Sequence, residues 1–147
     1  MKLGGFDVSA SALTAQRLRM DVISSNIANA ESTRAHFVDG RFVPYRRKEV
    51  VFAPAESPFR NILNNQLNAG SMQGVQVAAI KEDATPFKQV YNPAHPDADE
   101  NGMVYMPNVD LLKEMVDMIS ASRSYEANVT ALNASKAMFM KSLEIGR

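Results

Sequence analysis

"NVDLLKEMVDMISASRSYEANVTALNASKAMFMKSLEI", residues 108–145, is a long run near the end of the chain without a single proline or glycine. From Leu111, steps of alternately four and three residues reach ten positions, and eight of these are apolar. This spacing keeps one helix face apolar over many turns, as in a helix packed lengthwise on partner helices. We predict one helix from Asn108 to Ile145, with Asn108 as its N-cap and Asp110 at the positive end of its dipole.

Such a helix would be about 57 Å long. The free energy gained by burying one narrow apolar face barely offsets the conformational entropy that is lost when so many residues become ordered. The helix therefore needs neighbours along most of its length, either the other helix of the chain or other subunits.

The front of the chain has a second helix pattern of the same kind, which begins at Phe6 and fades after Ala30. Many alanines and serines flank its apolar positions, so other helices can approach closely on several sides. Three arrangements remain open: a two-helix hairpin that closes over a core, an assembly-forming coiled coil, or a different all-helical arrangement.

The middle of the chain differs in composition, since residues 37–106 hold six of the seven prolines and four of the seven glycines. Short runs bounded by turn residues predict strands at 42–52, 75–80, 87–91 and 103–106. The segment 60–74, rich in Asn, Gln and Gly, predicts a mobile loop or a segment that becomes ordered on contact with a partner.

The sequence thus predicts an α+β fold, in which long N- and C-terminal helices form a coiled-coil-like core around a small β-rich insert. We assign residues 1–36 to the N-terminal helix of the core, 37–106 to the insert and 107–147 to the long C-terminal helix. Polar Gln16, Ser122 and Lys136 within the pattern either set the register or are simply exposed. The predicted assembly seam consists of Leu13, Met20, Ile23, Ile27, Met115, Met118, Tyr125, Val129, Leu132 and Phe139.

Charge and composition narrow the function classes. Sixteen basic and sixteen acidic residues cancel, so no global field favours nucleic acid or acidic lipid, and we expect neither as a direct partner. The absence of cysteine excludes disulfides and thiol catalysis. The start of the chain has no apolar signal region, and we expect neither a cleaved signal peptide nor a membrane-spanning segment.

Motifs for chemistry are almost absent, and we predict no catalytic residue, no cofactor and no metal. Asp97, Asp99, Asn101 and Gly102 match the first places of a calcium loop, but Asn108 stands where a bidentate glutamate is needed. A solvated turn is the simpler interpretation, and calcium binding is the alternative. His36 and His95 lie far from any metal-ligand spacing, so we interpret them as structural.

The basic cluster Arg46-Arg47-Lys48 lies in "PYRRKEVVF". We interpret it as a solvated strand face, with a protein–protein contact and a nucleic-acid contact as alternatives.

Two stretches resemble the terminal signatures of bacterial flagellar axial proteins. "SASALTAQRLRMDVISSNIANAEST" near the start is shared in outline by rod, hook and hook-associated proteins. "VYNPAHPDADENGMVYMPNVDLLKEMVDMISASRSYEANVTALNAS" is narrower and resembles flagellar basal-body rod proteins of the proximal rod, as does "PYRRKEVVF". Asn92 and Ala94 depart from the usual pattern of that family, which affects only the local turn.

The resemblance implies a structural subunit of the proximal rod, exported from the cytoplasm by the flagellar type III apparatus without a cleaved signal. It would assemble through its terminal helices into the hollow drive shaft that crosses the periplasm and transmits torque. The implied partners are copies of itself, other proximal and distal rod proteins, and the adaptor between rod and membrane ring. A filament or needle subunit from outside the flagellum and a calcium-regulated binding module are the competing classes.

Overall fold

A computed structural model describes residues 4–38, 40–55 and 73–145, and it has two long helices and six strands. The strands pair into three separate antiparallel hairpins. The elements in chain order are α1 (Gly4–Ala28), β1 (His36–Val38), β2 (Arg41–Val43), β3 (Lys48–Pro54), β4 (Val75–Glu82), β5 (Lys88–Tyr91), β6 (Met103–Met106) and α3 (Leu111–Ile145).

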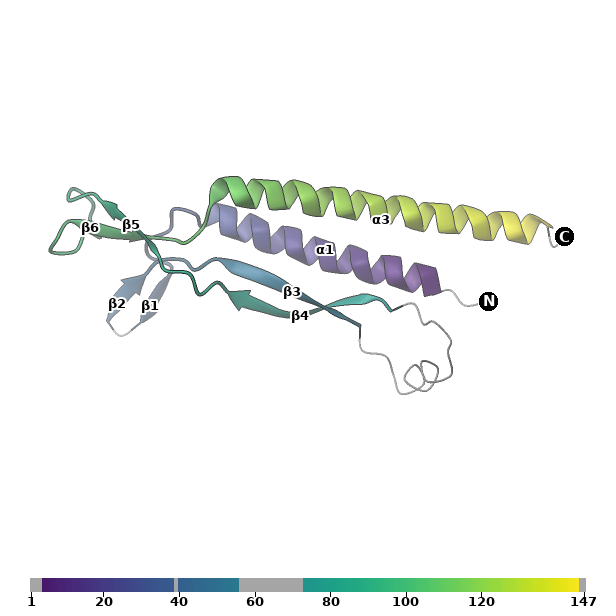
Figure 1. Ribbon diagram of the computed structural model, residues 1–147, viewed down its shortest axis with the longest axis horizontal. Coiled ribbons are helices and arrows are strands. Elements are labelled where there is room, and N and C mark those ends of the chain that lie inside the picture. Colours follow the sequence, from purple (N-terminus) through teal and green to yellow (C-terminus); the bar gives the residue numbers. More distant parts are fainter. Residues whose placement is uncertain (1–3, 39, 56–72, 146–147) are drawn as a thin grey trace.

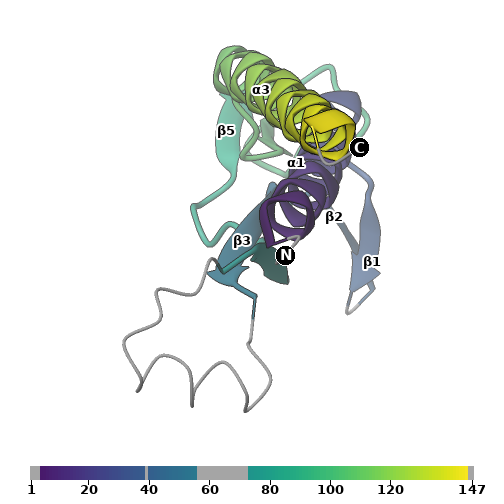
Figure 2. The ribbon, with the colours of Figure 1, turned by 90° about the vertical axis from the view of Figure 1, so that its right-hand side faces the viewer.

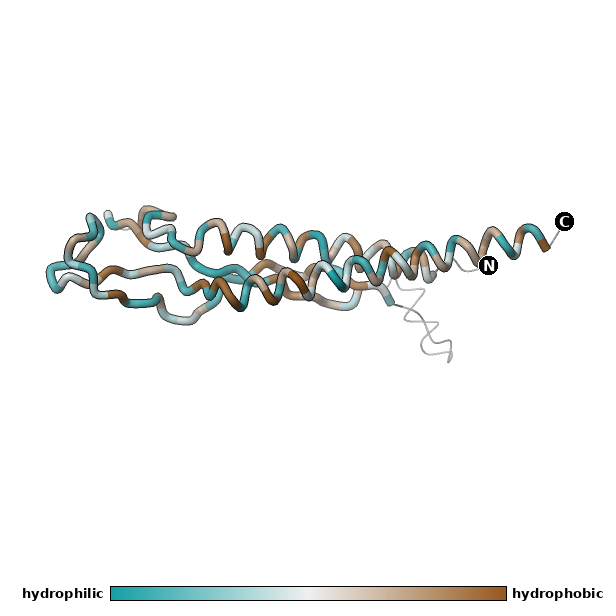
Figure 3. The backbone as a smooth tube through the Cα atoms, turned by 90° about the horizontal axis from the view of Figure 1, so that it is seen from above, coloured by the Kyte–Doolittle hydropathy of each residue, from teal (hydrophilic) through white to brown (hydrophobic). Residues whose placement is uncertain are grey.

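The two helices lie side by side and antiparallel, so both ends of the chain lie at the same end of the molecule (Figure 1). The Phe6 and Phe139 rings pack at a tilt with centroids 5.2 Å apart, and further along α1 a guanidinium nitrogen of Arg19 lies 3.3 Å from the Asp117 carboxylate. With 35 residues against 25, α3 is longer than α1 by about 15 Å. Its last turns extend past the start of α1 (Figure 3).

The β3–β4 hairpin covers the side of α1 that faces away from α3, which gives the molecule three layers (Figures 1 and 2). Its register pairs Lys48 with Glu82, and a bulge interrupts the ladder between Val51 and Phe52. At the far end of the hairpin, the backbone N–H of Val75 donates a 3.1 Å hydrogen bond to Oγ of Ser11. α1 is therefore the central layer of the molecule.

The hairpins β1–β2 and β5–β6 lie at the end of the molecule away from the two termini (Figure 1). Where they meet the helices, Tyr45, Val104 and Val109 are buried. Gly102 closes the turn before β6 with φ of 72°, and a Cβ there would approach the Tyr91 ring to 3.0 Å. Glycine is therefore required at this turn.

The structure confirms the α+β class and most of the predicted strands. The predicted runs at 75–80, 87–91 and 103–106 are β4, β5 and β6, and the run 42–52 divides into β2 and β3. Strand β1 was not predicted. Of the predicted loop 60–74, residues 60–72 lie outside the described part of the chain.

One helix boundary was predicted wrongly. α3 begins at Leu111, and Asp110 is its cap: Oδ1 of Asp110 accepts a 3.1 Å hydrogen bond from the backbone N–H of Leu112. Asn108 is not the N-cap, because its side chain binds the backbone of Arg47 and Thr85 instead. No helix in the described ranges is long and apolar enough to cross a membrane.

Candidate functional site: a buried polar latch and the faces of the long helix

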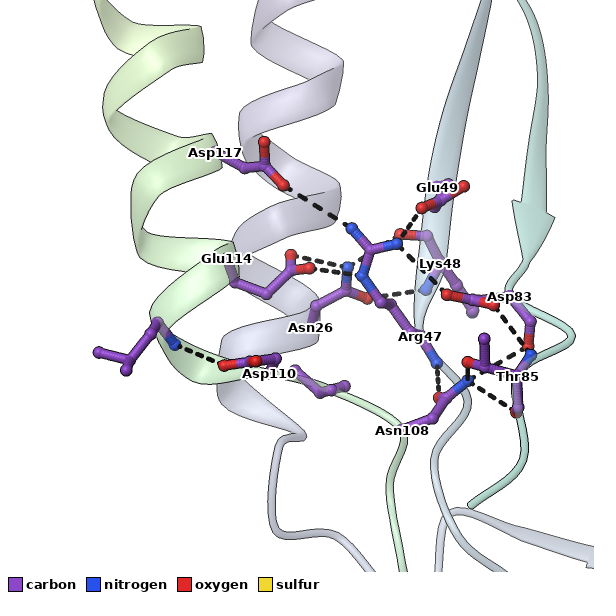
Figure 4. A network of polar contacts seen from close by, with 12 residues as sticks. Asn26, Arg47, Lys48, Glu49, Asp83, Thr85, Asn108, Asp110, Glu114 and Asp117 are labelled. Carbon is purple, nitrogen blue, oxygen red and sulfur yellow. Dashed lines mark hydrogen bonds and ion pairs between the residues drawn. The ribbon is translucent and has the colours of Figure 1, made fainter. Parts of the chain in front are cut away.

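Three polar side chains from three distant segments meet where α1, β3 and α3 converge (Figure 4). Asn26 comes from α1, Arg47 directly precedes β3, and Glu114 lies in the first turn of α3. Asn26 and Glu114 are 0% exposed and Arg47 is 7% exposed. We call these three residues the latch.

Arg47 is the centre of the latch. Its Nε donates a 2.6 Å hydrogen bond to Oε1 of Glu114, and its Nη1 donates to Glu49 and, at 3.5 Å, to Asp83. Asp117 lies 3.8 Å from Nη2. Burial alone lowers the pKa of the Arg47 guanidinium, but hydrogen bonds and charges from Glu114 and Glu49 outweigh burial and raise that pKa. The guanidinium therefore stays charged.

Asn26 uses both its donor and its acceptor groups. Its Nδ2 donates to the backbone carbonyl of Lys48 at 2.8 Å and to Oε2 of Glu114 at 3.0 Å. Its Oδ1 accepts from the backbone N–H of Lys48 and from the Tyr45 hydroxyl, each at 3.0 Å. A buried amide with these partners fixes the start of β3 against α1, because any shift would leave polar groups unpaired.

Backbone contacts extend the latch to the insert. The backbone N–H of Arg47 donates to Oδ1 of Asn108 at 2.8 Å, and the backbone N–H of Asp83 donates to the carbonyl of Arg47 at 2.8 Å. Nδ2 of Asn108 donates to Oγ1 of Thr85 at 2.9 Å. Hydrogen bonds from Thr85 are the main cause that lowers the pKa of the Asp83 carboxyl. The end of β4, the start of β3 and the approach to α3 are thus tied together.

The latch corrects the sequence interpretation of the basic cluster. Arg47 does not lie on a solvated strand face, because its side chain is buried and pairs with the buried Glu114 and with three more exposed carboxylates, those of Glu49, Asp83 and Asp117. Arg46 is only partly buried, with its guanidinium 4.7 Å from the centroid of the Phe87 ring. The sequence of a cluster of basic residues does not show which of them is buried. Glu114 was also missed, because a glutamate gives no sign of burial in the sequence, yet it is buried where the predicted seam residue Met115 is exposed.

The predicted seam residues on α1 lie on its covered side: Ile23 is buried, and Leu13, Met20 and Ile27 are half-buried. On α3 one predicted seam residue, Met115, is 51% exposed, and the residue before it, Glu114, is buried instead. The half-buried seam residues of α3 are Met118, Tyr125, Val129, Leu132 and Phe139. Whether any of them acts between subunits stays a prediction.

The three polar residues within the apolar repeats of the two helices differ in how far they are buried. Oε1 of Gln16 is buried and has no hydrogen-bond partner within the described residues. Ser122 is half-buried and Lys136 is exposed. Their role in setting the register stays a prediction.

Much of the surface of α3 is apolar. Nine of its large hydrophobic side chains are between 48% and 82% exposed. They gather near the two ends of the helix: Leu111, Leu112, Met115, Val116 and Ile119 at its start, and Met138, Met140, Leu143 and Ile145 at its end. So many large exposed apolar side chains on one helix are more than the scattered hydrophobic residues of an ordinary protein surface.

The loop that matches part of a calcium motif is held by an ion pair. Nε of Arg34 donates a 2.6 Å hydrogen bond to Asp97, and Oγ1 of Thr33 donates one at 2.8 Å. The hydrogen bond from Arg34, followed by that from Thr33, lowers the pKa of the Asp97 carboxyl. Over residues 4–38, 40–55 and 73–145, no three His, Cys, Asp or Glu side chains are grouped so that they could hold a metal ion.

Comparison with known proteins identifies the class at both ends of the chain. The family model described as "Flagella basal body rod protein" matches residues 6–35, and that described as "Flagellar basal body rod FlgEFG protein C-terminal" matches residues 100–145. The first match covers most of α1 and the second covers β6 and α3.

Relatives match over nearly the whole chain, and each is named flagellar basal-body rod protein FlgC. The protein of Bacillus subtilis is 58% identical over 145 residues, which cover 96% of this chain and 95% of the relative. The protein of Borreliella burgdorferi is 50% identical over 95% of this chain and 93% of its own length. That of Salmonella typhimurium is 45% identical over 97% and 96%.

The fold and these matches define a structural protein of the flagellar basal body, not an enzyme. The chain belongs to the FlgC family of flagellar basal-body rod proteins.

Proposed function

We propose that this chain is a subunit of the proximal rod, and that it assembles through its terminal helices into the hollow shaft that crosses the periplasm and transmits torque. Its neighbours would be copies of itself, other proximal and distal rod proteins and the adaptor between rod and membrane ring. The flagellar type III apparatus would export it from the cytoplasm without removing a signal peptide.

The observation that carries this proposal is the uncovered apolar surface of α3. A protein that acts as a single chain in water rarely exposes nine large hydrophobic side chains on one helix, as this chain does. Burial of such side chains in an assembly contributes roughly 1.5–3 kcal/mol each, so together they can hold a stable interface. The seam residues that remain half-buried would be covered further by neighbouring helices.

The latch supports a role in carrying mechanical load. It joins α1, α3 and the insert through buried, charge-assisted hydrogen bonds. A rotation applied to the helices would therefore move the insert with them as one body.

Deletion of the gene tests the proposal, with a plasmid-borne copy as control. Electron microscopy of detergent-extracted cell envelopes should show basal bodies without a completed rod, hook and filament, and the plasmid should restore all three. Complete, rotating flagella in the deletion strain would reject the proposal. The mass of the chain extracted from purified basal bodies tests separately whether a signal peptide is removed, because cleavage would make the chain lighter than the translated product.

A further inference from the structure

The turn between β5 and β6 contains Asn101 followed by Gly102, which is the one Asn-Gly pair in the sequence. This turn belongs to the end of the molecule away from the two termini (Figure 1). Asparagine is a chemically labile residue, and it is most labile before glycine, because glycine has no side chain that would hinder its backbone nitrogen. The Asn101 side chain is exposed to solvent. The pair therefore combines the residues and the exposure that deamidation requires.

Deamidation at this pair proceeds through a cyclic imide. The backbone nitrogen of Gly102 loses its proton and attacks Cγ of Asn101, which forms an N–Cγ bond and releases the side-chain nitrogen as ammonia. Water then opens the ring at one of its two carbonyl carbons. The product is either aspartate or isoaspartate, and in isoaspartate the main chain runs through the former side chain and is one carbon atom longer.

The fold holds the nitrogen that would attack. The backbone N–H of Gly102 donates a 2.7 Å hydrogen bond to the carbonyl of Asp99, and the carbonyl of Gly102 accepts a 2.9 Å hydrogen bond from the N–H of Asn92. The N–H of Asp99 in turn donates to the carbonyl of Met103 at 2.9 Å. Attack on Asn101 requires the Gly102 nitrogen to give up its proton, so the hydrogen bond to Asp99 has to break first.

The surroundings of Gly102 leave its backbone little room to rotate. Its φ is 72°, and a Cβ at this position would lie 3.0 Å from the Tyr91 ring and 3.2 Å from Cβ of Pro93. Tyr91 pairs with Met103 in the ladder, and Val104 beside it is 2% exposed. A rotation that frees the Gly102 nitrogen therefore requires the β5–β6 hairpin to open locally.

We propose that Asn101 is a deamidation site that is closed in the folded chain and open in the unfolded chain. The isoaspartate product lengthens the main chain before Gly102, which displaces the Gly102 carbonyl from the N–H of Asn92 and opposes formation of the turn. A copy that stays unfolded thus acquires damage that a folded copy avoids. This inference stands apart from the proposed function.

Peptide mass spectrometry of the full chain measures the reaction. One sample is kept in a mildly alkaline native buffer and the other in the same buffer with enough urea to unfold the chain. We expect Asn101 to react at least about ten times faster in urea, because a protected site reacts only through local opening. Asn133, which is exposed on α3 and precedes alanine, is the internal control and should react slowly in both samples.

Two variants separate the turn from the chemistry. Val104→Ala removes buried methyl groups from β6 and leaves the turn sequence unchanged, so it should raise the rate at Asn101 in native buffer several-fold but not the rate in urea. Asn101→Gln should abolish the reaction at this position in both samples, because the longer side chain has to close a larger and less favourable ring.

Equal rates at Asn101 in native buffer and in urea would overturn the inference, because the turn would then give no protection. Absence of the acid products at Asn101 in urea would overturn it as well, since the pair would not be labile. An unchanged native rate in folded Val104→Ala would reject hairpin opening as the controlling step. If this variant does not fold, the two samples of the unmodified chain still decide the question.

Discussion

Nε of Arg47 lies 2.6 Å from Oε1 of Glu114, and this ion pair joins residues 67 positions apart in the sequence. Glu114 is wholly buried, so its carboxylate depends on Arg47 and Asn26 for the partners that water would otherwise supply. The α3 helix can pack on α1 in this way only when the start of β3 is in place.

Replacement of Arg47 with methionine should lower the free energy of unfolding by about 3–5 kcal/mol, because it leaves the buried Glu114 carboxylate without its cation. Urea unfolding followed by circular dichroism measures the loss. Arg46→Met is the matched control, since Arg46 contacts Phe87 from a partly exposed position and its loss should cost about 0.5–1 kcal/mol.

The double variant Arg47→Met with Glu114→Gln tests whether the two residues act as a pair. If they do, the double variant should be more stable than the sum of the two single losses predicts, by at least about 1 kcal/mol. Strict additivity would show that the latch is not a coupled unit.

Asn26→Asp should destabilise the chain, although it changes a single atom. The new carboxylate would lie against Oε2 of Glu114, which is 3.0 Å from Nδ2 of Asn26 in the structure. Two buried carboxylates at this distance repel each other unless one of them is protonated. The loss of stability should therefore be large at pH 7 and shrink as the pH falls towards 5. Asn133→Asp, on the exposed surface of α3, should show no such pH dependence.

The unmodified chain should lose stability in acid. Folding lowers the pKa of Asp83 and Asp97, so both carboxylates contribute fully above their unfolded pKa of about 3.9. Their contribution disappears as the pH falls from about 5 through the folded pKa values, because the unfolded chain binds the protons first. Urea unfolding between pH 6 and 2.5 measures this slope, which Asp97→Asn should reduce and Asp99→Asn should not. An equal slope in both variants would contradict the role of the Arg34–Asp97 pair.

The long helix α3 and most strands could be predicted from the sequence because their signals are local. The apolar repeat of α3 and the turn residues around β4, β5 and β6 act within a few residues. The latch could not be predicted, because nothing near Arg47 in the sequence shows that Asn26 and Glu114 come to meet it. The same holds for Asn108, whose sequence context suits a helix cap but whose partners belong to other segments.

Gln16→Leu should stabilise the isolated chain. Oε1 of Gln16 is buried without a hydrogen-bond partner among the described residues, and such a group costs about 1–3 kcal/mol. We expect the free energy of unfolding to rise by about 1 kcal/mol. If Gln16 sets the register between subunits, the same substitution should reduce swimming despite the more stable chain. A less stable chain would show that the oxygen already has a partner.

If exposed apolar side chains of α3 build the rod, a charge placed on one of them, as in Leu143→Asp, should block assembly. Because Leu143 is 71% exposed, the substitution should change the stability of the single chain by no more than about 0.5 kcal/mol. Ser142→Asp, which adds the same charge one residue away, is the matched control.

The measurement is electron microscopy of basal bodies from a deletion strain that carries either variant. We expect cells with Ser142→Asp to complete the rod, hook and filament, whereas cells with Leu143→Asp should stop before the rod is complete. Complete rods in cells with Leu143→Asp would contradict this expectation.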